Sequence, residues 1–133
     1  MKQKFQLLKT SWGIVIFINV EEDTNITNTD SHATDEIYLR VEWTSGIFKE
    51  EIIEWFTRAI KDNLSKIELS GKVCFDVSDI DFNDCHFQEE GFYYVMQAWL
   101  AKRFNFELPP LDAYYDGDKN KYMFPSLISN NDV

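Results

Sequence analysis

Within residues 52–77, IIEWFTRAIKDNLSKIELSGKVCFDV, the spacing between apolar residues changes at Gly71. Before Gly71 the apolar residues recur at spacings of three and four, which is typical of an amphipathic α-helix. After Gly71 the spacing falls to two, so Val73, Phe75 and Val77 share one face of a strand. A helix and a strand that each bury a single face predict an architecture in which helices pack on a sheet.

Two amphipathic helices are expected. The first follows Thr44 or Ser45, either of which is a suitable N-cap, and the second spans about residues 88–104. Their apolar stripes consist of Ile52, Trp55, Phe56, Ala59, Ile60 and Leu64 in the first helix and of Phe92, Val95, Met96, Trp99, Leu100 and Phe104 in the second. We expect the large aromatic residues of both stripes to lie in the core, because each sits on the apolar side of its helix.

Four segments have the composition and alternation of strands, namely residues 5–8, 12–20, 37–43 and 72–77. The residues between the second and third strands lack apolar periodicity and are dense in Asn, Asp, Thr and Ser, which predicts a long loop over 21–36. The residues after the second helix contain all three prolines of the chain, which predicts an irregular tail packed along the surface.

The order strand–strand–strand–helix–strand–helix predicts an α+β fold. In the simplest arrangement a largely antiparallel sheet carries both helices on one face, as a two-layer sandwich with an irregular C-terminal tail. At 133 residues the chain is expected to form one domain over residues 1–133. A chain of this length can bury a core without a structural metal or a disulfide.

The charge of the chain limits its expected partners. It has 23 acidic and 13 basic residues, a net charge of −10, which repels the phosphates of nucleic acids and of anionic membranes. Neither is therefore expected as a partner, and a basic protein is the natural complement. More than half of the excess lies in residues 68–91, which hold seven acids and one base. The two cysteines and the lack of an export signal predict a cytoplasmic protein with reduced thiols.

The acidic stretch DIDFNDCHFQEE, residues 79–90, matches four positions of the twelve-residue calcium loop. However, Asp84 stands at the sixth position, where that loop needs Gly for its sharp turn, and the preceding segment has the pattern of a strand instead of a helix. The stretch is better explained as the end of a strand, a turn with Asn83 and Asp84 at its tip, and the start of a helix at Gln88. We expect no specific metal site.

No set of residues predicts catalysis. Cys85 and His86 are adjacent, so in an extended segment they point to opposite faces and cannot form a dyad with each other. A pair of Cys85 with His32 stays open, but nothing orients His32 in its loop. The cysteine and histidine spacings do not match a zinc site, and common nucleotide-binding and hydrolase motifs are absent from the sequence. We expect neither an enzyme nor a cofactor, with a small carboxylate-based enzyme or cation-binding protein as the third alternative.

The expected interface combines carboxylates with aromatic anchors. It consists of Asp79, Asp81, Asp84, Glu89, Glu90, Tyr93 and Tyr94. The carboxylates would speed association with a basic protein, and a tyrosine would slow dissociation as a buried anchor. In one alternative, at least one of the two tyrosines covers the edge of the sheet. In another, the interface is the loop at residues 21–36.

Residues 46–104, from GIFKEEIIEWF to FYYVMQAWLAKRF, resemble the fourth domain of elongation factor G and of related ribosomal protection factors. The shared order is a Gly, a helix that carries Lys49 and Glu50, a strand, a polar turn with His86 and a second helix. The resemblance covers less than half of the chain, and the Ser-rich turn and paired glycines of that family are missing. It implies a split strand–helix–strand–helix fold and, as an alternative function, a translation-factor-like or ribosome-associated module.

In size, acidity and single-domain organisation the chain is similar to bacterial immunity proteins. These are small, acidic, cytosolic inhibitors of nucleic-acid-cleaving or otherwise basic toxins. The likeness is one of class, and no residue motif carries it. It implies a protein-binding inhibitor whose acidic surface occludes the active or binding surface of a basic partner.

Overall fold

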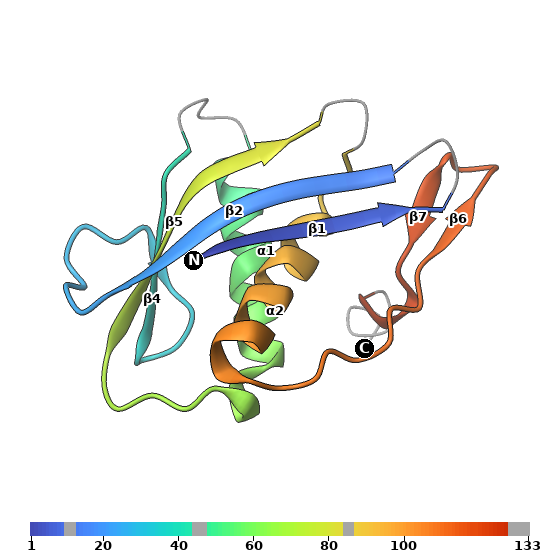
Figure 1. Ribbon diagram of the computed structural model, residues 1–133. Helices are drawn as coiled ribbons and strands as arrows, with labels where there is room; N and C mark the ends of the chain where they lie inside the picture. Colours follow the sequence, from blue (N-terminus) through green and yellow to red (C-terminus); the bar gives the residue numbers. More distant parts are fainter. Residues whose placement is uncertain (10–12, 44–47, 84–86, 128–133) are drawn as a thin grey trace.

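The computed structural model describes residues 1–9, 13–43, 48–83 and 87–127 (Figure 1). Its helical elements are α1 (Lys49–Asp62), a short 3₁₀ turn (Leu64–Lys66) and α2 (Gly91–Phe104). Its strands are β1 (Lys2–Leu8), β2 (Gly13–Asp23), β3 (Ser31–His32), β4 (Ile37–Val41), β5 (Val73–Phe82), β6 (Tyr114–Asp116) and β7 (Lys121–Met123). Each segment predicted as a strand overlaps an observed strand, and each predicted helix overlaps an observed helix.

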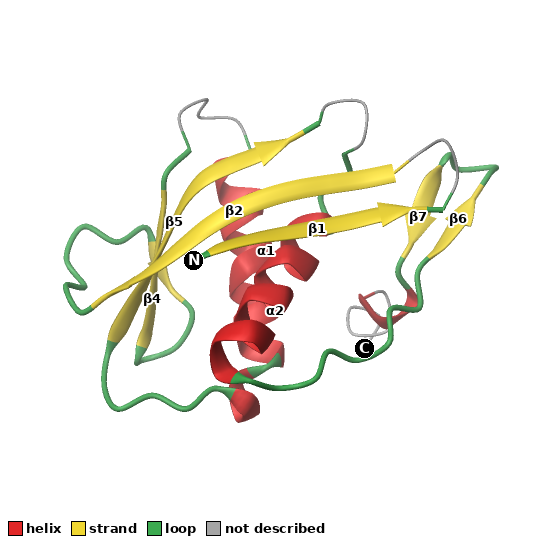
Figure 2. Ribbon diagram, in the orientation of Figure 1, coloured by secondary structure: helices red, strands yellow, loops and turns green. Residues whose placement is uncertain are grey.

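The main sheet has the strand order β1–β2–β5–β4–β3 (Figure 2). Neighbouring strands are antiparallel except β4 and β5, which are parallel and are connected through α1. Parallel neighbours require a crossover connection, and α1 supplies it. The mostly antiparallel sheet confirms the predicted α+β class, whereas the parallel pair was not part of the prediction.

Both long helices cover the same face of the sheet (Figure 1). The alternating residues that face them are buried, namely Ile14, Ile16, Ile18 and Val20 of β2, Ile37, Leu39 and Val41 of β4, and Val73, Phe75 and Val77 of β5. From α2, the indole of Trp99 meets Phe75 nearly edge-on, with ring centroids 5.0 Å apart. Because full burial of one such side chain contributes about 1.5–3 kcal/mol, this layer supplies most of the driving force for folding.

The predicted apolar stripes reach this core with few exceptions. On α2, every stripe residue except Phe104 is buried, and on α1 the buried residues are Ile52, Phe56, Ala59 and Ile60. Trp55 is only partly buried, and the guanidinium of Arg58 lies 5.6 Å from its ring centroid. The expectation that Trp55 is a core residue holds only in part, because its ring packs against the core but lies at the boundary with solvent.

Both helices begin later than predicted. The N-cap residue of α1 is Phe48, in the left-handed region with φ 66°, instead of Thr44 or Ser45, which lie outside the described residues. Phe48 makes no side-chain cap, so the sequence signal for capping does not mark the observed start.

The first turn of α2 packs closely on β2. The helix begins at Gly91 and not at Gln88. A Cβ atom at Gly91 would lie 2.5 Å from Cδ1 of Ile16 and 2.8 Å from Cγ2 of Ile14. Glycine therefore allows the start of α2 to approach β2 closely.

Strand β5 extends beyond its predicted end at Val77 as far as Phe82. Its register with β2 shifts between the pairs Phe17–Asp81 and Asn19–Ser78, which is a β-bulge. Asp79 lies in the bulge with φ 51°, a left-handed conformation that favours Gly and that Asp tolerates. Asp79 and Asp81, which were expected near a turn, are consequently strand residues.

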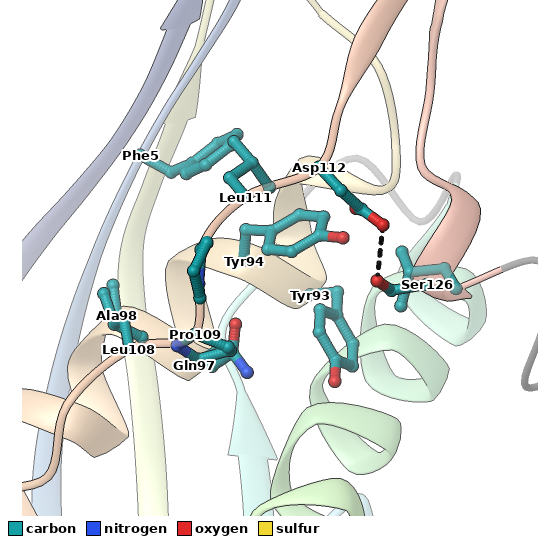
Figure 3. A pocket seen from close by; sticks show the side chains of 12 residues that line it. Phe5, Tyr93, Tyr94, Gln97, Ala98, Leu108, Pro109, Leu111, Asp112 and Ser126 are labelled. Atoms are coloured by element: carbon teal, nitrogen blue, oxygen red, sulfur yellow. Dashed lines mark hydrogen bonds between the residues drawn. The ribbon is translucent and has the colours of Figure 1, made fainter.

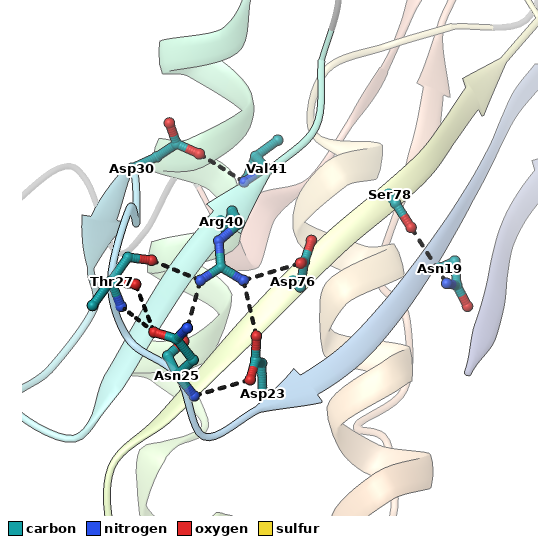
Figure 4. A network of polar contacts seen from close by, with 9 residues as sticks. All are labelled: Asn19, Asp23, Asn25, Thr27, Asp30, Arg40, Val41, Asp76 and Ser78. Carbon is teal, nitrogen blue, oxygen red and sulfur yellow. Dashed lines mark hydrogen bonds and ion pairs between the residues drawn. The ribbon is translucent and has the colours of Figure 1, made fainter.

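The polar segment that follows β2 is organised around Arg40 (Figure 4). The guanidinium group pairs with Asp76 at 3.0 Å and with Asp23 at 3.3 Å. It also donates to the backbone carbonyls of Asn25 at 3.1 Å and Thr27 at 2.8 Å. The predicted long loop is thus shortened by the extension of β2, contains the two residues of β3, and is attached to the sheet by one side chain.

The C-terminal segment is less irregular than predicted. Strands β6 and β7 form an antiparallel hairpin, and residues 125–127 form a helical turn. Tyr122 and Phe124 are buried, while Tyr114 is exposed. The two buried rings confirm that the segment packs along the domain, and the expectation of an irregular tail was wrong for the hairpin.

Candidate functional site

The residues predicted to form one interface lie in separate places. They are Asp79 and Asp81 on β5, Glu89 and Glu90 just before α2, Tyr93 and Tyr94 within α2, and Asp84, which lies outside the described residues. The two aspartates of β5 and the residues of α2 are divided by the sheet itself. The structure therefore does not bring the predicted set together.

Asp79 and Asp81 are exposed on the face of the sheet that α1 and α2 leave uncovered. The strand register places Lys4, Phe17 and Asp81 in one row across β1, β2 and β5. The middle residue, Phe17, is 41% exposed, and the ammonium group of Lys4 lies 5.5 Å from its ring centroid. This face carries both signs of charge, so Asp79 and Asp81 do not make it a purely acidic surface.

A group of four carboxylates lies instead beside the helices. This acidic cluster consists of Glu51 and Glu54 from α1 and of Glu89 and Glu90 from the segment before α2. Burial chiefly, and then the charges of Glu90, Glu51 and Glu54, raise the pKa of Glu89 above its ordinary value, while Lys121 lowers it by less. The like charges therefore outweigh the nearby cation, and negative potential accumulates here.

Tyr93 is not a surface anchor. It is only 5% exposed, and its hydroxyl donates to Asp62 of α1 at 2.8 Å. Burial, followed by the hydrogen bond to Asp62, raises the pKa of the phenol well above its ordinary value, so the hydroxyl keeps its proton. The expectation that Tyr93 is exposed for a partner was wrong, because α1 and the C-terminal segment cover it.

Tyr94 covers the edge of the sheet, as one of the alternative interpretations expected. Its ring stacks on Phe5 of the edge strand β1 at 5.4 Å and lies 5.0 Å from the ring of Phe124. Burial raises its pKa as well, with smaller contributions from Asp112 and Glu90. Tyr94 is half-buried and joins three parts of the chain that are distant in sequence.

The two tyrosines also line a cavity of about 180 Å³ between α2, β1 and residues 108–112 (Figure 3). Sequence patterns did not indicate it, because its far wall is formed by the apolar run Leu108–Pro109–Pro110–Leu111, which has no helical or strand period. In the structure both leucines of this run are exposed.

The residues considered for thiol or metal chemistry are only partly described. Cys74 is buried on the outer side of β5, and burial raises the pKa of its thiol, so it is a poor nucleophile. Cys85 and His86 lie outside the described residues. Among the residues that the structure describes, no three His, Cys, Asp or Glu side chains are placed to share a metal ion.

Gln88, which was predicted only as a helix start, connects two parts of the structure. Its side-chain amide donates to Glu90 at 3.2 Å and to the carbonyl oxygen of Tyr122 at 2.7 Å. The same amide thus connects the acidic cluster to β7. In the sequence, the only indication of this role was an amide side chain between a predicted strand and a predicted helix, which is a weak signal.

Comparison with known proteins assigns no family. The sequence matches no protein-family model, and no curated protein is significantly similar to it. Within the described part of the chain, no helix is both long and apolar enough to cross a bilayer.

Proposed function

We propose that this protein is a stoichiometric inhibitor of the immunity-protein kind, which binds a basic, toxin-like protein and occludes its active or binding surface. The observation that supports the proposal is the acidic cluster of Glu51, Glu54, Glu89 and Glu90, in which the pKa of Glu89 is raised by burial and by its neighbours. A cationic partner would relieve the repulsion among these carboxylates.

Trp55 is the aromatic residue best placed to accompany the cluster. It is partly exposed and shares a shallow hollow of about 130 Å³ with Glu90 and Lys121. A tryptophan at the edge of a charged patch can be fully desolvated when a partner covers it, which is typical of the residues that contribute most to binding. In this proposal Trp55 takes the anchoring role that was first expected of Tyr93 or Tyr94.

The acidic cluster also determines the expected kinetics. The net charge of −10 attracts a basic protein over distances of about a Debye length, and the cluster orients the encounter. Association should therefore be fast at low ionic strength and should slow as salt is added. The dissociation rate should depend on Trp55, because the contact between its buried ring and the partner must break before the complex separates.

The first test is capture of the partner from the native host with the immobilised protein at low salt. The captured protein must be basic, and its own activity must fall as the inhibitor approaches equimolar amounts. Recovery of ribosomes would instead favour the translation-factor-like alternative. Capture of an acidic protein, or of a basic protein that stays fully active, would contradict the proposal.

The second test compares association rates of two triple variants. Glu51→Gln/Glu54→Gln/Glu89→Gln should associate about tenfold more slowly than wild type at low salt and nearly equally at high salt. The control, Asp35→Asn/Glu107→Gln/Asp118→Asn, removes the same number of exposed carboxylates elsewhere. Equal losses in both variants would show that only net charge matters.

A third variant examines the interface that was first predicted from sequence. Asp79→Asn/Asp81→Asn removes two carboxylates on the uncovered face of the sheet. If the helix side binds the partner, this variant should retain most of the wild-type association rate. A larger loss here than in the cluster variant would move the interface to the outer face of β5.

A further inference from the structure

The cavity beside Tyr93 and Tyr94 has the size of a site for a single ring. Its volume is about 180 Å³, which is similar to the engineered apolar cavity of about 150 Å³ that binds benzene. Helix α2 and strand β1 form one side, and residues 108–112 and 126–127 form the other (Figure 3). The cavity therefore lies between α2 and the C-terminal segment that passes over this helix.

Its walls are largely apolar and aromatic. Phe5, Tyr93 and Tyr94 present their rings, with the Tyr94 ring stacked on Phe5 at 5.4 Å and nearly perpendicular to the Tyr93 ring at 5.1 Å. Leu108 and Leu111 form the outer rim and are 49% and 37% exposed. Aromatic rings arranged around a small space attract cations as well as apolar groups.

The polar atoms at the cavity are mainly hydrogen-bond acceptors. At the mouth, the carboxylate of Asp112 accepts a hydrogen bond from Ser126 at 2.7 Å and is otherwise exposed. Inside, Gln97 is 7% exposed, and its amide nitrogen donates to Asn63 at 3.4 Å. Figure 3 shows the Gln97 oxygen on the side of the tyrosine rings. A ligand that donates hydrogen bonds fits this arrangement, and an anion does not.

We propose that this cavity binds a small monocyclic amphipathic cation, whose ring enters between Tyr93, Tyr94 and Leu108 and whose protonated amine remains at the mouth beside Asp112. The ring replaces water against apolar walls, and the amine meets a carboxylate without losing all of its hydration. The net negative charge of the whole chain likewise favours a positively charged ligand.

The proposal is independent of the acidic cluster. None of the four glutamates lines the cavity, and none of the residues around it is changed in the partner-binding variants. A failure to bind cations here would leave the protein-binding proposal intact. A failure to bind a basic protein would likewise leave this cavity as a small-molecule site.

The test uses three probes of similar size that differ in charge: benzylammonium, benzyl alcohol and benzoate. Titrations of the full chain followed by ¹H–¹⁵N NMR should move the amides of Ala98, Leu108, Leu111 and Asp112. Benzylammonium should bind with a dissociation constant of about 1 mM or tighter, benzyl alcohol more weakly, and benzoate most weakly. Binding of benzoate as tight as that of benzylammonium, or no shifts at about 10 mM of any probe, would overturn the proposal.

Three variants locate the binding. Ala98→Leu keeps a good helix former on α2 and fills the cavity, so all probes should lose at least about tenfold in affinity. Asp112→Asn should weaken benzylammonium about two- to fivefold and leave benzyl alcohol unchanged. Glu107→Gln removes a neighbouring exposed charge that does not line the cavity, and it should alter neither.

A second route covers the case in which Ala98→Leu does not fold. Leu108→Ala shortens a rim residue that is 49% exposed, so the fold should persist while every probe binds more weakly. Wild-type affinity in a folded Leu108→Ala variant, or wild-type affinity of Asp112→Asn for benzylammonium, would contradict the assigned orientation.

Discussion

The side chain of Gln88 pairs with the backbone of Tyr122 as a neighbouring strand would. Its Nε2 donates to the carbonyl oxygen of Tyr122 at 2.7 Å, and its Oε1 accepts from the Tyr122 N–H at 2.9 Å. At the other end of Tyr122, its side-chain hydroxyl accepts a hydrogen bond from the N–H of Lys9 at 2.8 Å. The C-terminal hairpin is thereby fixed to both the start of α2 and the end of β1.

Replacing Gln88 with Ala should lower the free energy of unfolding by about 2 kcal/mol, because this partly buried side chain loses its two hydrogen bonds to the backbone of Tyr122. Urea denaturation at neutral pH measures the change. Gln6→Ala, on an exposed position of β1, serves as the control and should change stability by no more than about 0.5 kcal/mol. Similar losses in the two variants would mean that the amide pair does not stabilise the hairpin.

Asp79 should tolerate glycine better than alanine. With φ 51°, Asp79→Ala should destabilise the protein by about 1 kcal/mol, whereas Asp79→Gly should be nearly neutral. The matched change at Asp81, an ordinary strand position, should have the opposite preference, with Gly the less stable of the two. Thermal unfolding of the four variants decides the matter, and the same ranking at both positions would argue against the bulge.

Glu89 should make stability depend on pH. Its pKa in the folded protein is raised above the ordinary value of 4.5, so its ionisation opposes folding at neutral pH, and this opposition disappears when the group is protonated. Glu89→Gln should therefore increase the free energy of unfolding at pH 7 by less than about 1 kcal/mol, since the group is largely exposed. Below pH 4.5 the variant and wild type should converge.

The comparison for Glu89 is Glu107→Gln, which removes one exposed carboxylate outside the acidic cluster. It should leave the stability nearly unchanged at neutral pH. If Glu89→Gln proves less stable than wild type at pH 7, burial and repulsion of the Glu89 charge do not dominate its effect on stability.

Arg40 should control the mobility of the segment that follows β2. Lysine at this position keeps the charge but cannot donate from one planar group to two carboxylates and two carbonyls. Arg40→Lys should therefore lose part of this set of contacts. Hydrogen exchange of the amides in residues 24–28 should be faster in this variant. The control is Arg103→Lys, whose guanidinium pairs with the Glu22 carboxylate and lies over the Phe104 ring but, within the described chain, does not contact residues 24–28, and it should leave those amides unchanged.

Local patterns predicted the elements that bury a single apolar face. The stripe from Phe92 to Leu100 and the alternation at Val73, Phe75 and Val77 are short-range signals, and the structure places them in the core. The continuation of β5 through Asp79 was missed because those residues are polar on the uncovered face, and their strand conformation depends on pairing with β2.

The candidate site was harder to predict because long-range packing decides exposure. Tyr93 is next to the apolar stripe in sequence, and only the approach of Asp62 and of the C-terminal segment makes it buried. Glu51 and Glu54 are distant from Glu89 in the sequence, and nothing local indicated that Glu89 would lie near them. The cavity forms only where three distant segments of the chain meet, and the periodicity of a single segment cannot predict such a meeting.

The position of β5 between β2 and β4 has a consequence for synthesis. The residues of β5 that pair with β2 come more than fifty positions after their partners, so the ribosome needs about 3–10 seconds to supply them. During that interval the β1–β2 hairpin can form, but the Ile-rich second strand has an unpaired edge. The nascent chain is thus most prone to aggregate before its central strand emerges, and holding chaperones would act on it in that interval.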